Sequence, residues 1–303
     1  MSLTQQSEKM SWAFVTPSYS GDYQRCLLLC RSMDAFLIGN WTHYVVVDRP
    51  HFAMFRHLQG PRRNVLITDQ VLPNNMRLLF HIPFAGGRSV WWSKSAGLSI
   101  GWHLQQMVKI GIASIVKEDG LAYCDSDTFF LKPFDVKLLT RGGKFRLYRD
   151  AEPTKLNLGP NPAFTKAALG MLGIPVEDNY YSYVGNFVTW RRQSVLDLQQ
   201  HLSMKHGGHW QRAFRNRLQV SEYNLYGLYV DCLSDPDENH FHSSKWLCKT
   251  HWSRQTMTKA QVQEFCEGLA PNEVMAGIQS FAKVDMGLLE QQFERALQKG
   301  KPI

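Results

Sequence analysis

Two carboxylates stand one residue apart, directly after an apolar run. Residues 121–134 read LAYCDSDTFFLKPF, in which Asp125 and Asp127 follow the apolar segment. Like charges at this spacing raise each other's pKa unless a cation lies between them. Carboxylate oxygens are the ligands that magnesium and manganese prefer. The pattern therefore predicts a divalent-metal site, and the alternative is a solvated strand end where both aspartates point into water.

The elements that must position these carboxylates follow from the hydrophobic pattern. Strand-like and helix-like segments alternate along the first half, in the order 12–18, 21–37, 43–48, 51–58, 64–72, 93–116 and 121–127. This alternation predicts an α/β fold with a mixed, mainly parallel sheet flanked by helices. Such sheets bind ligands at the carboxyl ends of their strands. We therefore expect Ser18, Asp48 and Asp127, which end three of these strands, to lie along one rim.

The second half is less regular. Its predicted strands are 144–150 and 181–192, and its predicted helices are 162–173, 193–206, 221–232, 258–269 and 285–299. Thr258 and Gln261 fit a capping box, and Asp285 is an expected N-cap. We expect a flexible arm over residues 1–10 and a single domain over 11–303 that ends in a helical elaboration.

Composition and charge narrow the function classes. The 303 residues are 44% hydrophobic and 20% charged, as in ordinary globular proteins. No apolar run approaches the roughly 20 residues that span a bilayer, and MSLTQQSEKM lacks a signal-peptide core. A cytoplasmic protein with reduced cysteines is therefore expected. The charge of +8 comes from scattered residues, which predicts no nucleic-acid partner but favours anionic small substrates or peripheral contact with an acidic membrane.

Several nucleotide-binding and phosphatase patterns are absent. No GxGxxG follows the first strand, and no GxxxxGK[ST] occurs. Haloacid-dehalogenase phosphatases carry DxDx[TV], but Phe129 stands at the last position of that pattern here.

The surroundings of DSD instead resemble glycosyltransferases of the GT-A type. TPSYSGDYQRC, HYVVVD, the Gln-Gln-x-x-Lys helix, DSD and SEYNLYG together resemble a bacterial family of DxD glycosyltransferase-like proteins over residues 12–255. The resemblance implies a Rossmann-like GT-A domain, with a nucleotide-binding half over 11–140 and an acceptor-side half over 141–303. It also implies transfer of a sugar from a nucleotide-diphospho-sugar to a saccharide or lipid-linked acceptor, in bacterial polysaccharide or glycolipid synthesis, peripheral to the inner membrane.

The resemblance assigns a metal site. Asp125 and Asp127 would hold Mn²⁺ or Mg²⁺, which neutralises charge on the leaving diphosphate. A histidine near the C-terminus completes this site in glycogenin-like relatives, and His251 is the candidate here. His251 is equally consistent with a hydrogen-bonded core histidine, and His240 and His242 are the fallback ligands.

The remaining roles concern donor and acceptor. The expected nucleotide-binding residues are Thr16, Ser18, Tyr19, Asp22, Arg25, Asp48 and Lys109. Lys109 is the candidate phosphate lysine, whereas capping of a helix would equally explain Asp22. Asn186 is expected on the acceptor side. Glu222 is the candidate general base, and helix capping is its alternative role.

Two other functions remain open at this point. A sugar-nucleotide nucleotidyltransferase would need a glycine-rich basic loop after the first strand, which TPSYSGD lacks. A catalytically silent nucleotide- or sugar-binding module would keep the fold without turnover.

Overall fold

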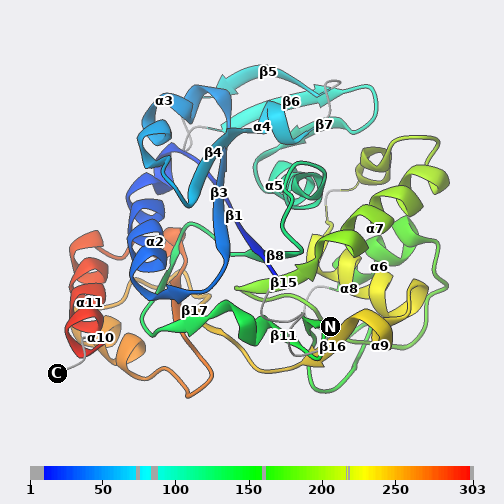
Figure 1. Cartoon of the computed structure of the whole chain (residues 1–303). Coiled ribbons are helices and arrows are strands. Elements are labelled where there is room, and N and C mark those ends of the chain that lie inside the picture. Colours follow the sequence, from blue (N-terminus) through cyan, green and yellow to red (C-terminus); the bar gives the residue numbers. More distant parts are fainter. Residues whose placement is uncertain are drawn as a thin grey trace.

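A five-stranded sheet forms the centre of the molecule (Figure 1). The computed structural model describes residues 10–72, 76–82, 88–158, 162–215, 217 and 219–300, so most of the predicted N-terminal arm lies outside the described residues. The strand order is β15 (Val188–Arg191), β8 (Gly120–Tyr123), β1 (Trp12–Ser18), β3 (Trp41–Val47) and β4 (Arg63–Ile67). Strands β8, β1, β3 and β4 are parallel, and β15 pairs antiparallel with β8. The predicted α/β class with a mainly parallel sheet is thus confirmed.

Alternate residues of the central strand β1 enter two separate cores. In β1, Ala13 and Val15 pack into one hydrophobic cluster, while Trp12 and Phe14 pack into the other. This is the two-residue period of a strand buried on both faces. It explains why the strand sequences are continuous apolar runs rather than alternating ones.

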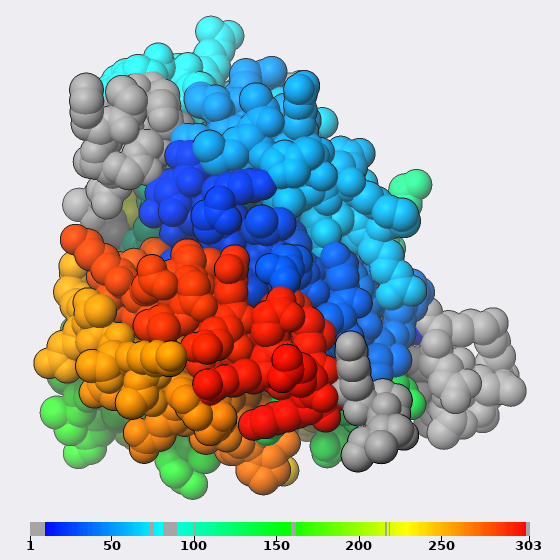
Figure 2. Space-filling model, turned by 90° about the vertical axis from the view of Figure 1, so that its left-hand side faces the viewer, coloured from blue at the N-terminus to red at the C-terminus, as the bar shows by residue number. Residues whose placement is uncertain are grey.

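Helices cover both faces of this sheet (Figure 1). One core contains residues of α5 (Gly101–Gly111), α6 (Pro162–Leu172), α7 (Arg192–Lys205) and α8 (Glu222–Leu233). The other contains residues of α2 (Tyr23–Phe36), α10 (Lys259–Glu267) and α11 (Met286–Lys299). Figure 2 shows the C-terminal α11 lying beside the N-terminal segment that holds α2, where Arg31 and Glu294 pair at 2.7 Å. Two shorter helices are α3 (Phe52–Phe55) and α4 (Thr68–Val71), and α9 spans Pro236–Asn239.

Smaller sheets surround the centre. Three-stranded sheets are formed by β17 (Cys248–His251), β18 (Met275–Ile278) and β9 (Thr128–Phe130); by β11 (Thr140–Arg141), β12 (Lys144–Tyr148) and β16 (His240–Ser243); and by β5 (Arg77–Ile82), β6 (Arg88–Ser93) and β7 (Gly97–Ile100). Two-stranded pairs are β10 (Phe134–Asp135) with β2 (Leu37–Ile38), and β13 (Thr154–Lys155) with β14 (Asn179–Tyr180). The first of these sheets matters for function, because β9 continues directly from DSD.

Three predicted elements differ from the observed ones. The helix expected over 93–116 begins only at Gly101, because residues 88–100 form the β6–β7 hairpin. Gly97, where β7 begins, and Gly101, where α5 begins, have φ of 74° and 46°, left-handed conformations that glycine adopts readily. The strand expected over 64–72 ends at Ile67, and the strand expected over 181–192 is ordered as β15 only from Val188.

Both capping residues stand where they were predicted. Thr258 and Gln261 form the expected capping box of α10. Asp285 is at the N-cap position of α11, although its side chain makes no capping bond. Within the described residues, no helix has the length and apolar character that a membrane span requires.

Candidate active site

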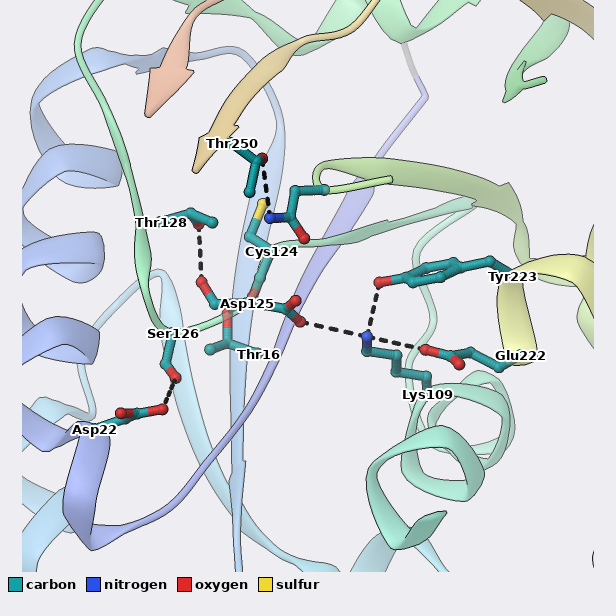
Figure 3. A network of polar contacts seen from close by, with 11 residues as sticks. Thr16, Asp22, Lys109, Cys124, Asp125, Ser126, Thr128, Glu222, Tyr223 and Thr250 are labelled. Carbon is teal, nitrogen blue, oxygen red and sulfur yellow. Dashed lines mark hydrogen bonds and ion pairs between the residues drawn. The ribbon is translucent and has the colours of Figure 1, made fainter. Parts of the chain in front are cut away.

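The DSD loop continues the alternation of β8 beyond its last residue. Leu121 and Tyr123 pack into the core that contains α5 and α8, whereas Ala122 and Cys124 face the core that contains α2. Figure 3 shows that the next two side chains continue this alternation. Asp125 extends toward α5 and α8, and Ser126 extends toward the start of α2.

Backbone acceptors hold this loop in place. The Asp125 carbonyl accepts from the Thr128 backbone amide at 3.1 Å and from its hydroxyl at 2.8 Å, which closes a tight turn. The Cys124 carbonyl accepts from the Thr16 hydroxyl at 2.8 Å. Thr16 is fully buried, and its hydroxyl oxygen also lies 3.0 Å from His43 Nε2. The predicted contact of Thr16 with a nucleotide is therefore replaced by a structural role between β1 and the DSD loop.

Asp127 is buried and only partly satisfied. Its Oδ2 accepts from the Ser280 backbone amide at 2.9 Å, while its Oδ1 is buried without a hydrogen-bond partner. Burial, followed by the charges of Asp125 and Asp22, raises the pKa of Asp127 to about 7. A buried carboxylate oxygen without a partner beside two further carboxylates is the environment in which a bound cation is favoured.

Lys109 connects α5 to both Asp125 and α8. Its Nζ lies 3.3 Å from Asp125 Oδ1 and 3.0 Å from Glu222 Oε1, and it donates to the Tyr223 hydroxyl at 2.7 Å (Figure 3). Burial alone lowers the pKa of Lys109, but the two carboxylates outweigh burial and raise it well above its usual value. Lys109 therefore stays charged beside the first aspartate of DSD.

Glu222 is the first residue of α8, and Ser221 is its N-cap. The Ser221 hydroxyl accepts from the Asn224 backbone amide, so Glu222 is not the capping residue. The Glu222 side chain is 3% exposed and is paired with Lys109. This geometry places the predicted base in contact with the predicted phosphate lysine.

The structure does not bring His251 to the aspartates. Cys248 Sγ and Thr250 Oγ1 lie 3.7 Å apart on one face of β17, so His251 occupies the opposite face. Its Nε2 lies 3.1 Å from the Gln255 carbonyl, and its ring packs near Phe265. The geometry therefore does not support His251 as a metal ligand, and its ring is hydrogen-bonded but only half-buried, so it is not a core histidine either.

The fallback histidines are engaged elsewhere. His240 Nε2 lies 2.9 Å from the Tyr226 hydroxyl, and burial lowers the pKa of His240 to about 4. His242 Nε2 lies 2.8 Å from Asp231. Across the described part of the chain, no three or more His, Cys, Asp or Glu side chains are grouped closely enough to hold a metal.

The start of α2 faces the DSD loop through Asp22. Its Oδ2 accepts from the Ser126 hydroxyl at 3.2 Å, and although Asp22 stands at the N-cap position of α2, its side chain makes no capping bond. Burial raises the pKa of Asp22. A Cβ at Gly21 would lie 2.5 Å from the ring of Tyr19, so a larger residue there would have to displace this ring. Tyr19 is half-buried at this same turn.

Arg25 has a structural role. Its guanidinium donates to the Ile278 carbonyl at 3.0 Å and to the Val284 carbonyl at 3.2 Å. These bonds hold the chain that carries Ser280 against α2. The predicted phosphate contact of Arg25 is therefore not supported by its geometry.

The other predicted residues line the strand ends as follows. Ser18 is buried at the end of β1. Asp48 Oδ1, after β3, accepts from the Thr68 hydroxyl at 2.7 Å. Asn186 is buried and donates to Thr250 Oγ1 at 3.1 Å.

A cavity of about 510 Å³ lies at the outer strand β4. It is lined by residues such as Phe52 and Gln70, and none of the predicted site residues lines it.

Three contributors were not predicted from the sequence. Tyr223 follows Glu222 directly, and its hydroxyl reaches Lys109. Ser126 is the middle residue of DSD. Ser280 contributes its backbone amide to Asp127, and the sequence carries no signal for such a contact. For Tyr223 a signal existed, since it stands in a polar run, Glu222 to Asn224, that opens a mostly apolar helix.

The fold and site define a class: an α/β protein with two carboxylates and a paired lysine at the carboxyl edge of a parallel sheet. A protein-family model described as "Family of unknown function (DUF6492)" matches residues 11–284. The match covers most of the chain, and the chain belongs to this family. No curated protein matches the sequence.

Proposed function

We propose that this protein is a metal-dependent glycosyltransferase with a GT-A fold, which moves a sugar from a nucleotide-diphospho-sugar to an acceptor hydroxyl. One observation carries the proposal: Asp125 and Asp127 lie at the carboxyl end of β8, with Lys109 contacting Asp125. A carboxylate pair suits a divalent cation, and a buried ammonium beside it suits a phosphate. Together they favour a diphosphate as the ligand.

The residues that would hold Mn²⁺ or Mg²⁺ are Asp125 and Asp127. Asp127 Oδ1 is buried without a partner. The charge of Asp22 contributes to the raised pKa of Asp127, but within the described residues the three carboxylates are not grouped as closely as a three-ligand metal site requires. Hard oxygen donors of this kind are those both ions prefer. When bound, the ion would supply Lewis-acid stabilisation of the leaving diphosphate.

The chain's own residues would orient the donor. Lys109 would pair with a phosphate oxygen in place of part of its contact with Asp125. Glu222 and Tyr223 fix the lysine side chain from α8, so that its ammonium points at the loop. If this orientation were lost, the affinity for a nucleoside diphosphate would fall more than the affinity for the nucleoside.

Release of nucleoside diphosphate tests the proposed reaction. Purified protein is incubated with a panel of nucleotide sugars and Mn²⁺, with and without saccharide acceptors, and released nucleoside diphosphate is measured. We expect release from at least one donor, which Asp127→Asn abolishes and the exposed Asp178→Asn control leaves intact. Binding without release would indicate a silent binding module. Pyrophosphate-dependent formation of a sugar 1-phosphate would indicate a nucleotidyltransferase.

The base role of Glu222 needs a separate experiment. Glu222→Gln keeps the shape of the side chain and a hydrogen bond to Lys109. If Glu222 is the general base, transfer falls by about 10²–10⁴-fold while donor binding is kept. If Glu222 only positions Lys109, donor affinity falls together with the rate, and a product with retained anomeric configuration would exclude an inverting base.

A further inference from the structure

The β5–β7 sheet exposes an apolar face. Cross-strand pairs share a face, and the register pairs Leu78 with Trp91 and Trp91 with Ser99, of which Trp91 and Ser99 are buried. The opposite face carries the pairs Arg77–Trp92 and Trp92–Leu98.

Much of that opposite face is open to solvent. Trp92 is 43% exposed and Leu98 is 66% exposed. Phe80 follows a register shift in β5 and is 55% exposed, whereas its partner Val90, two residues along β6 from Trp92, is 9% exposed. Figure 1 places this sheet at one end of the molecule, beyond α4. We call the exposed side chains Arg77, Phe80, Trp92, Lys94 and Leu98 the β5–β7 face.

The segment that forms this face is basic. Residues 70–100, which include its three strands, contain no Asp or Glu and carry three Lys or Arg residues. Arg77 and Lys94 are exposed within the face itself. Tryptophan, leucine and phenylalanine flanked by basic side chains are the composition that inserts into the headgroup region of a bilayer. Each basic residue there adds attraction to anionic lipids.

We propose that the β5–β7 face docks onto an anionic phospholipid bilayer. A second copy fits less well, because pairing two such faces would bring the basic residues of both copies together. Docking through this face would leave the candidate site near the bilayer. Helix α5 begins directly after β7, and Lys109 lies eight residues from its start. That separation is about 12 Å along a helix, so a bilayer bound here would lie close to the DSD loop. The proposal does not depend on the proposed transferase activity.

Vesicle sedimentation of the full chain tests this docking. We expect binding to vesicles of phosphatidylcholine mixed with phosphatidylglycerol and weak binding to phosphatidylcholine alone. Trp92→Ser with Leu98→Ser should lower the partition coefficient at least about tenfold, while Trp252→Ser, at a tryptophan 52% exposed elsewhere, should not. Lys94→Ala should lower it about fivefold, unlike Lys259→Ala on α10.

The outcomes separate the alternatives. Circular dichroism and nucleoside diphosphate binding of the double variant should match those of the wild type, because both replaced side chains are exposed. Absence of wild-type binding to anionic vesicles overturns the proposal, as does unchanged binding by the double variant. A concentration-dependent dimer that the double variant abolishes, without vesicle binding, would assign the face to self-association instead.

Discussion

At the scale of single residues, the site is defined by which charges face one another. Asp125 pairs with Lys109, whereas Asp127 turns inward and leaves one carboxylate oxygen without a partner. Two neighbouring aspartates thus have different environments, and a cation would be held by one exposed and one buried carboxylate. Lys109 is the residue that joins this pair to the rest of the site.

Lys109→Met should separate binding from stability. Removing the ammonium leaves Glu222 buried without its charge partner, so we expect a loss of about 3–5 kcal/mol in the free energy of unfolding. Affinity for a nucleoside diphosphate should fall by ~1–3 kcal/mol, with little change for the nucleoside. Denaturant unfolding and calorimetry measure the two effects, and Lys109→Met with Glu222→Gln should restore part of the stability. Equal losses for both ligands would make Lys109 purely structural.

The raised pKa of Asp127 predicts a pH dependence of stability in chelator. The carboxyl titrates near 3.8 when unfolded and at about 7 when folded, so the folded state binds the extra proton. Stability should therefore fall as the pH rises from about 4 to about 7 and then level off. The Tm of the wild type should drop between about pH 5 and about pH 8 by more than that of Asp127→Asn. Identical slopes would contradict the assignment.

At the scale of elements, the ends of β1 and β8 are held together by hydrogen bonds that bury polar groups. Thr16→Val keeps the shape but leaves the Cys124 carbonyl and His43 Nε2 without this partner. We expect a loss of about 1–3 kcal/mol for each group left unsatisfied. Thr16→Ser keeps the hydroxyl and should lose only about 1 kcal/mol for the missing methyl. A Thr16→Val protein as stable as Thr16→Ser would show that these bonds contribute little.

The sequence predicted elements well where a local period defines them. The apolar runs of β1, β3 and β8 and the helices α2, α6 and α7 lie close to their predicted ranges. The β6–β7 hairpin was mistaken for the start of a helix, because the left-handed conformations of Gly97, where β7 begins, and Gly101, where it gives way to α5, leave no periodic signal in the sequence. The antiparallel pairing of the edge strand β15 with β8 was not predictable, since it joins segments more than sixty residues apart in the sequence.

The candidate site shows the same division. The DSD loop and Lys109 were predicted from local pattern, and the structure places them in contact. His251 was misassigned because the sequence does not reveal which face of β17 is turned toward the DSD loop. Cys248 and Thr250 share one face, and His251 lies on the other. Arg25 and Thr16 were misassigned because their acceptors are backbone carbonyls of distant segments.

At the scale of the whole molecule, the charged site and the exposed β5–β7 face lie at the two ends of one short helix. Helix α5 begins after β7 and reaches the DSD loop through Lys109. This arrangement suits an enzyme that uses an anionic soluble donor close to a membrane surface. The net charge of +8 favours both partners.

Calorimetric titration with uridine and guanosine diphosphate tests the central claim most directly. The wild-type protein, Asp127→Asn and Asp178→Asn are each titrated in Mn²⁺ and in chelator. We predict that at least one nucleotide binds the wild type and Asp178→Asn much more tightly with Mn²⁺, and that Asp127→Asn loses this difference while remaining folded. Equal wild-type affinity with and without metal would contradict the account.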